Sequence, residues 1–129
     1  IVKQARNSEK AYTCLKAAWV LRGWRETLER EPGTEEKRAE LKAQEKEYLK
    51  NAMEGFIAAE AAESFPICGM DDTTLEYLIA NLAFELGKYD IASKLISEIL
   101  IRPYANSRMK EKTRELKDAV LAELRKNKA

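Results

Sequence analysis

The stretch Thr73–Pro103, TTLEYLIANLAFELGKYDIASKLISEILIRP, decides the fold class of this chain. Its apolar residues recur at steps of three and four, stop at Gly87-Lys88, and resume at Ile91. This 3.6-residue period predicts two amphipathic helices. Gly87 can adopt the left-handed conformation that ends a helix, and Pro103 cannot continue the second one. The stretch therefore predicts an antiparallel helical hairpin over about residues 73–102.

Small residues and the turn sequence suggest how this hairpin packs. Ala80 and Ala92 stand where two helices would cross closely, and the turn reads Leu86-Gly87-Lys88-Tyr89. Together with Pro103, these residues resemble the tetratricopeptide repeat, which has small residues at the crossing, a Leu-Gly-any-Tyr turn and a closing proline. The resemblance implies hairpins stacked into a right-handed superhelix.

An internal echo about forty residues upstream predicts an earlier hairpin, over about residues 7–64. Its first helix is expected to start at a capping Asn7 or Ser8 and to run to about Arg30. Thr34 is expected to cap the second helix, whose highly charged first half should project into solvent. The echo pairs two ordered sets of residues, Leu49, Ala52, Phe56, Ala59 and Pro66 with Tyr89, Ala92, Ile96, Ile99 and Pro103.

A terminal helix is predicted over about residues 106–126, with one apolar stripe and charge elsewhere, as in a capping helix. The third helix has alternative caps: Thr73 with Glu76 has capping-box spacing, and Asp71 or Asp72 could cap earlier. The full prediction is an all-α single domain of about five helices. Because the chain starts at Ile1, it is expected to be a fragment of a longer protein.

Composition excludes several classes of partner. Charged residues make up 35% of the chain, but the net charge is only +1, so no overall field favours nucleic acid or a membrane. No uncharged run reaches the roughly 18 to 20 residues of a membrane span, and Cys14 and Cys68 suit thiols in a reducing compartment, so we expect a cytoplasmic protein. The terminal helix is basic but lacks interleaved aromatic residues, which favours a solvated face over a nucleic-acid surface.

No catalytic constellation is visible in the sequence. The absence of histidine removes Ser-His-Asp and Cys-His sites and imidazole zinc sites. Cys68 precedes a helix, where a thiol pKa can fall, yet no base accompanies it, so an inert loop thiol is favoured. Asp71 and Asp72 lack calcium-loop spacing and suit helix capping. We expect no enzyme activity, no cofactor and no metal site.

Two surfaces are candidates for recognition. In a repeat stack, the first helix of the central hairpin would line the concave side and present Thr74, Tyr77, Asn81, Phe84 and Glu85. The alternative is that Tyr77 and Phe84 are buried against the first hairpin. The second surface surrounds Trp24, because the opening helix is apolar on more than one face. Either the following repeat covers that second face, or Trp24 meets a missing N-terminal segment or a second subunit.

The order of signals also resembles the C-terminal part of an uncharacterised bacterial protein family whose N-terminal region carries CPxC-type cysteine pairs. The matching pieces are LKAAWVLR at 15–22, Gly69-Met70, LEYLIANL at 75–82, and Leu86-Gly87 with Ala92. The chain has none of the cysteine pairs, and it carries Asn81 where an acidic residue is usual. The resemblance implies the fold and a bacterial cytoplasmic origin but no activity.

The leading functional hypothesis is a non-enzymatic protein-interaction module. Its partner would be a peptide, a helix or the missing N-terminal part of its own chain. The alternatives are a homodimerisation domain and the regulatory domain of a zinc-dependent enzyme.

Overall fold

The computed structural model describes residues 6–127. These residues form five α-helices and no β-strand, which confirms the predicted all-α class and helix count. The chain divides into two compact units, Ile1–Ala62 and Glu63–Ala129. The stacking of hairpins into a tetratricopeptide-like superhelix stays a prediction. The helices are α1 (Asn7–Leu28), α2 (Glu35–Ala62), α3 (Asp72–Glu85), α4 (Tyr89–Leu100) and α5 (Ser107–Asn127).

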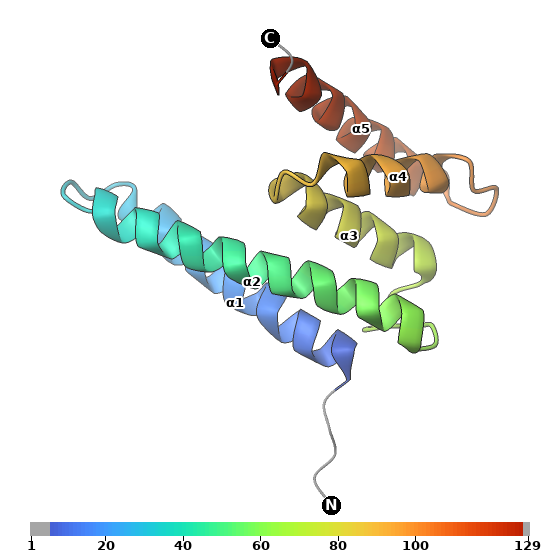
Figure 1. Cartoon of the computed structure of the whole chain (residues 1–129), viewed down its shortest axis with the longest axis horizontal. Coiled ribbons are helices and arrows are strands. Elements are labelled where there is room, and N and C mark those ends of the chain that lie inside the picture. Colours follow the sequence, from blue (N-terminus) through green and yellow to red (C-terminus); the bar gives the residue numbers. More distant parts are fainter. Residues whose placement is uncertain (1–5, 128–129) are drawn as a thin grey trace, which may run out of the picture. The chain divides into compact units, whose positions relative to one another are not determined.

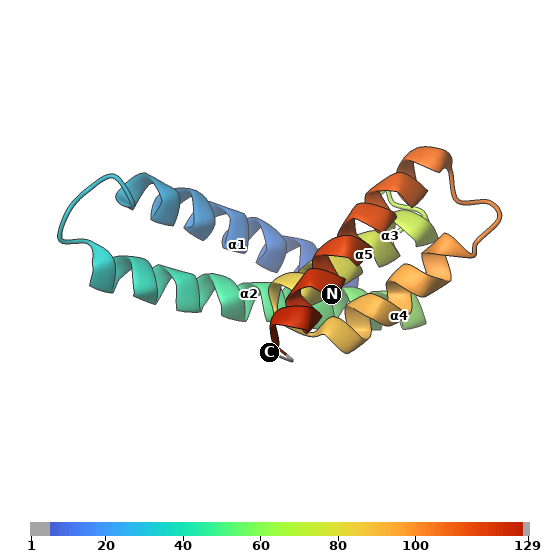
Figure 2. The same ribbon diagram turned by 90° about the horizontal axis from the view of Figure 1, so that it is seen from above.

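The first unit is a hairpin in which α1 and α2 run antiparallel, side by side (Figure 1 and Figure 2). The α1 residues that face α2 recur at alternating steps of three and four, as in the seam of a coiled coil. Ser8, Ala11, Leu15 and Ala18 of this seam are buried. The matching seam on α2 follows the same spacing and includes the buried residues Leu41, Glu45, Ala52 and Ala59, with Gly55 half-buried among them.

A close contact between α1 and α2 lies at Gly55. A Cβ atom placed on Gly55 would come within 2.8 Å of Ala11 Cβ, 3.3 Å of Ala11 Cα and 3.4 Å of Asn7 O. Carbon atoms in contact ordinarily lie about 3.5 to 4.0 Å apart. A glycine is therefore required at this position by space, although the helix interior would by itself favour alanine.

The expectation that the charged first half of α2 projects into solvent holds for most of its residues but not for Leu41 and Glu45. Leu41 is only 1% exposed and Glu45 only 4% exposed, because α1 extends far enough to cover both. The charged residues around them dominate the composition of this segment and conceal the two buried positions. Leu41 and the ion-paired Glu45, four residues apart, are enough to continue the seam with α1.

The second unit contains α3, α4 and α5, with α3 and α4 both in contact with α5. Gly87 has a φ of +76° and ends α3 as predicted. The Lys88 N–H donates to Ala83 O over 2.8 Å, and the Gly87 N–H donates to Phe84 O over 3.1 Å. These two bonds form a Schellman motif, which supplies donors to the last carbonyls of α3 and turns the chain into α4.

The burial pattern agrees with the predicted internal echo. Ala52 and Ala92 are both 0% exposed, and the pairs Phe56 with Ile96 and Ala59 with Ile99 are also buried. Ala80, the predicted partner of Ala92 at the crossing, is completely buried as well. The helices differ in length, however, with 22 and 28 residues in the first hairpin and 14 and 12 in the second.

The terminal helix α5 has the amphipathic character predicted for it. Thr113, Leu116 and Val120 are buried, whereas most of its charged residues are exposed. Asn106 caps the helix by accepting a hydrogen bond from Met109 N over 2.8 Å. One apolar stripe therefore packs on the unit, and the remaining surface carries the charge.

The other helix starts partly follow the predictions. α1 begins at Asn7 as expected, but Arg6 is the cap residue, and its N–H donates to the Glu9 carboxylate over 3.3 Å. The hydroxyl of Thr34 lies 2.9 Å from Leu28 O and 2.8 Å from Glu31 O. Thr34 thus ties the connecting loop to the end of α1.

Asp71 is the cap residue of α3, which resolves the alternatives left open by the sequence. Its carboxylate accepts a hydrogen bond from Thr74 N over 2.8 Å. We expect Asp71→Ala to lower the free energy of unfolding by about 1 kcal/mol, because the Thr74 N–H then loses its acceptor. Asp71→Asn keeps an acceptor oxygen and should remain within a few tenths of a kcal/mol of the unsubstituted protein. Urea denaturation of the three proteins measures the difference, and equal midpoints for all three would contradict the assigned cap.

Candidate interaction surfaces

The predicted concave residues lie on one face of α3, because they are spaced by three, four and seven along the helix. Thr74, Tyr77, Asn81 and Phe84 are half-buried, and Glu85 is exposed. The Asn81 side-chain amide donates to Tyr77 O over 3.1 Å, and the Phe84 ring packs 5.9 Å from the Tyr89 ring at the start of α4. Part of the binding capacity expected of Asn81 and Phe84 is therefore used inside the second unit.

A second surface lies on the outer flank of α1, beside its seam with α2. Trp24 is 48% exposed and Val20 is 70% exposed, so this flank leaves large apolar side chains in contact with water. The flank consists of two adjoining rows with steps of three, four and seven. One row comprises Cys14, Ala17, Leu21, Trp24 and Leu28, and the other comprises Thr13, Val20 and Thr27. None of these residues is charged.

A groove of about 650 Å³ follows this flank between α1 and α2. Its α1 wall is made by Ala17, Val20 and Leu21, and its α2 wall by Gln44, Glu47, Tyr48 and Asn51. The two walls therefore differ, since one is apolar and the other is polar and acidic. Trp24 continues the apolar wall by one helical turn, and the Lys37 ammonium group lies over its ring at 5.0 Å from the centroid.

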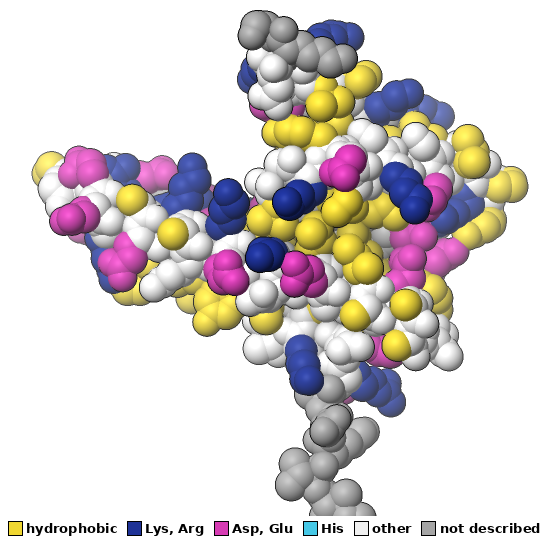
Figure 3. All heavy atoms as spheres, viewed as in Figure 1, with side chains coloured by type: hydrophobic (Ala, Val, Ile, Leu, Met, Phe, Trp, Pro, Cys, Tyr) yellow, Lys and Arg dark blue, Asp and Glu magenta, His cyan; other side chains and the backbone are white. Residues whose placement is uncertain are grey.

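The sequence prediction named Trp24 but not the α2 wall. The signal for Glu47 and Asn51 was present in their heptad spacing to Glu40, Gln44 and Glu54. It was hidden because α2 carries charge around most of its surface. Figure 3 shows this mixture of acidic, basic and apolar side chains along the hairpin.

A buried carboxylate, Glu45, joins α2 to two arginines of α1 within the seam. Arg22 Nε lies 3.0 Å from Glu45 Oε1, and Arg25 Nη2 lies 3.1 Å from Oε1 and 2.9 Å from Oε2. Burial by itself raises the pKa of Glu45, but the hydrogen bonds from Arg25 and then Arg22 outweigh it, so the pKa lies below its ordinary value of 4.5. The carboxylate is fully used by these two arginines, which indicates a role in holding the hairpin.

A second charged cluster, in the second unit, ties the segment after α4 to the first turn of α3. The Arg102 guanidinium donates to Glu76 and to Thr73 Oγ1, and the Tyr104 hydroxyl donates to Asp72. The hydrogen bond from Tyr104 is the largest influence on Asp72 and lowers its pKa, and the bond to Glu76 raises the pKa of Arg102. These partners are held by one another, so the cluster fastens the helices together.

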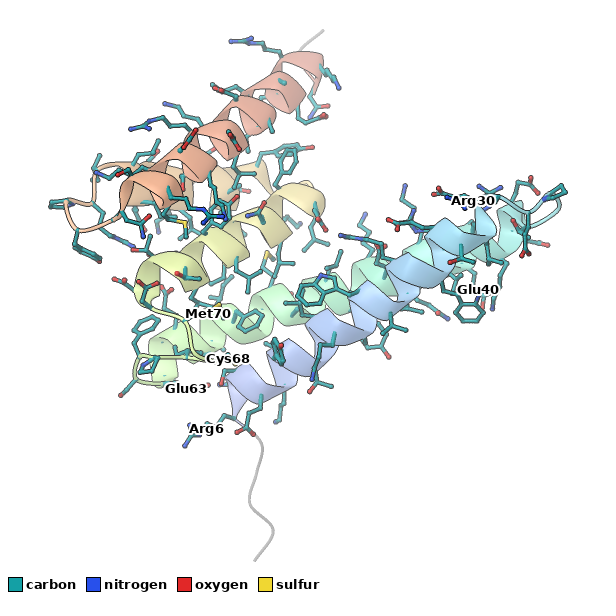
Figure 4. All side chains as sticks on the ribbon, turned by 180° about the vertical axis from the view of Figure 1, so that it is seen from behind. Arg6, Arg30, Glu40, Glu63, Cys68 and Met70 are labelled. Atoms are coloured by element: carbon teal, nitrogen blue, oxygen red, sulfur yellow. The ribbon has the colours of Figure 1, made fainter. Side chains whose placement is uncertain are left out.

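The described part of the chain contains no group of three or more His, Cys, Asp or Glu side chains able to hold a metal ion. Cys68 lies with Met70 in the short connector before α3 (Figure 4), in a turn closed by paired hydrogen bonds between Ile67 and Met70. Cys68 itself has a φ of +49° and is followed by Gly69 at +75°. Asp71, which stands close to it in sequence, is engaged as the cap of α3.

The fold and these surfaces define a small all-α protein built from helical hairpins. Residues 1–120 match the family described as "Uncharacterized protein conserved in bacteria (DUF2225)", and the chain belongs to that family. Comparison with curated proteins and with solved structures gives no match. None of the helices within residues 6–127 combines the length and apolar character needed to cross a bilayer.

Proposed function

We propose that this protein is a non-enzymatic protein-protein interaction module, and that the outer flank of α1 is its principal contact surface. The observation that carries the proposal is the exposure of Val20 and Trp24 in an uncharged strip on a helix whose opposite seam is already filled by α2. Burying such a strip contributes about 25 cal/mol per Å² of apolar surface removed from water. Aromatic residues of this kind also commonly dominate binding energy at interfaces.

The α3 face with Tyr77 and Asn81 remains in the proposal as a second contact surface. Its half-buried side chains offer less apolar area than the α1 flank, and Asn81 already donates one hydrogen bond within its own helix. The alternative function, homodimerisation, draws on the same α1 strip. The proposal retains the bacterial cytoplasm as the expected location.

The test uses paired substitutions at two strongly exposed apolar residues. Val20→Asp places a charge in the strip, whereas Ile101→Asp makes the same kind of change at a residue that is 81% exposed in the loop after α4. A photo-crosslinking amino acid at position 20 first identifies the bound protein in the native bacterium. We then expect the purified partner to bind the unsubstituted protein saturably, the Val20→Asp variant at least about tenfold more weakly, and the Ile101→Asp variant with unchanged affinity.

Two results would contradict the proposal. One is that a crosslinker at position 20 captures no protein beyond those that a crosslinker at position 101 also captures. The other is that Val20→Asp and Ile101→Asp weaken binding equally. A crosslink between two copies of this chain, together with twice the 14.7 kDa monomer mass in light scattering, would establish the homodimer instead.

A further inference from the structure

We propose that the groove between α1 and α2 binds an amphipathic helix with an apolar face and a row of Lys or Arg along one edge. This inference rests on the proposed interaction function and specifies the chemistry of the partner. It follows from the shape of the groove, the difference between its two walls, and the charges along α2.

The shape of the groove favours a helix over an extended peptide. Its walls are the sides of two long helices, whose backbone N–H and C=O groups are already paired within each helix. An extended peptide lying there would find no row of backbone partners, whereas a helix satisfies its own backbone hydrogen bonds. α1 also presents a second seam, with Ala17, Leu21 and Trp24 at heptad spacing, in addition to the seam filled by α2. Two such seams on one helix are the arrangement that a third helix completes.

The charges along the α2 wall determine the edge of the partner. Glu40, Glu47 and Glu54 are all exposed and recur every seven residues, so they form one acidic row along α2. This row spans fourteen residues, or about 21 Å of helix. Glu40 lies at the end of the hairpin that also holds Arg30 (Figure 4). Glu47 thus lies in the wall that faces the apolar side of the groove, and Glu40 and Glu54 follow one heptad away from it in either direction along α2.

Neighbouring lysines compensate only one end of this acidic row. Lys37 lies 3.8 Å from Glu40 and over the Trp24 ring. Glu47 and Glu54 make no ion pair with any residue in the part of the chain that the structure describes. Lys50 stands three residues after Glu47 and four before Glu54, so it is a helical neighbour of both, but it forms no ion pair with either and its position is turned further from the groove. A helix with Lys or Arg at matching heptad positions would neutralise Glu47 and Glu54 while its apolar face covers Val20 and Leu21.

A second copy of this chain is a poorer occupant on electrostatic grounds. The facing flank of α1 carries no basic residue between Thr13 and Leu28, so it cannot neutralise the acidic row of a partner copy. A symmetric pair would bring two acidic rows to one interface without compensating charge.

The experiment uses two synthetic helical peptides of about three heptads. Both have leucine at the seam positions, and one has lysine along the edge where its twin has glutamate. Binding of each labelled peptide to the full chain is followed by fluorescence anisotropy at low and moderate salt. We expect the lysine peptide to bind at least about tenfold more tightly than the glutamate peptide, with the difference decreasing as salt screens the charges.

Charge reversal in the protein separates specific from general attraction. In Glu47→Lys/Glu54→Lys the preference should change to the glutamate peptide. The matched control Glu111→Lys/Glu115→Lys alters the net charge equally at exposed positions of α5 and should leave the preference for the lysine peptide unchanged. Val20→Asp should weaken binding of both peptides.

The inference is overturned if both double variants change the preference equally, if neither does, or if neither peptide binds. It is also overturned if light scattering shows two copies joined through this groove. The interaction function itself would survive these results if the partner crosslinked at position 20 still binds and is still lost in Val20→Asp.

Discussion

Replacing Gly55 with leucine is expected to lower the free energy of unfolding by about 3 kcal/mol, and replacing it with alanine by about 1 kcal/mol. A Cβ at this position comes within 2.8 Å of Ala11 Cβ, and both atoms are attached directly to helix backbone, so neither can rotate away. Inserting atoms into a tightly packed contact costs about 1 to 3 kcal/mol. The gain in helix propensity from removing glycine, about 1 kcal/mol, offsets only part of that cost.

Gly23 provides the matched control for Gly55. It also lies within a helix, but a Cβ placed on it meets nothing within 4 Å. Gly23→Ala should therefore raise the free energy of unfolding by about 0.5 to 1 kcal/mol, because only the higher helix propensity of alanine contributes. Guanidinium denaturation measures all of these variants, and a stabilising Gly55→Ala would show that the helices separate at no cost.

Removing the opposing methyl group should rescue the alanine variant in part. The double variant Ala11→Gly/Gly55→Ala eliminates the 2.8 Å contact and leaves only the contacts at 3.3 and 3.4 Å. Its free energy of unfolding should exceed the value expected from adding the two single changes by about 1 kcal/mol. Strict additivity would exclude this contact as the cause.

Replacing Glu45 with alanine is expected to cost about 2 to 3 kcal/mol of unfolding free energy at neutral pH. Breaking a buried ion pair costs about 3 to 5 kcal/mol because a buried charge loses its partner. We expect the smaller cost of about 2 to 3 kcal/mol here because the side chains of Arg22 and Arg25 are 32% and 21% exposed and can turn toward water. Glu45→Gln retains an acceptor but loses the charge, so it should cost about half as much. Equal stability of Glu45→Ala and the unsubstituted protein would show that the cluster contributes nothing.

The lowered pKa of Glu45 predicts that the free energy of unfolding depends on pH. Because the folded-state pKa of Glu45 lies below its ordinary value of 4.5, the folded state holds the proton less tightly than the unfolded state. The resulting stability is fully present above about pH 5 and is lost as the pH falls through the folded-state pKa. The difference in unfolding free energy between the unsubstituted protein and Glu45→Gln should be constant near neutral pH and shrink below about pH 4.5. Asp72, whose pKa is also lowered, contributes in the same direction in both proteins and cancels from this difference.

Local signals predicted the helices and several of their ends because each signal acts within a few residues. The apolar period of Thr73–Pro103 predicted α3 and α4, and the left-handed Gly87 is confirmed at the turn between them. The stripe through Thr113, Leu116 and Val120 likewise predicted the buried side of α5. The match over residues 1–120 confirms an uncharacterised bacterial family, whereas the CPxC-type cysteine pairs and the tetratricopeptide-like character attributed to it stay predictions.

Long-range contacts were beyond prediction, and the α2 segment shows the reason. Glu45 faces two arginines 23 and 20 residues away, whereas Glu47 faces the groove, and the charge around most of α2 hides this difference in the sequence. Gly55 likewise resembles any glycine in a helix until Ala11 is placed against it.

The sequence alone thus determined an all-α chain with defined helix ends, since period, capping residues and glycine conformations operate between near neighbours. The tertiary structure decided which side of each helix is filled. That choice sets Glu45 inside the hairpin and leaves Val20, Trp24 and the acidic row of α2 outside it, because burial depends on which helix lies opposite and not on the residue type.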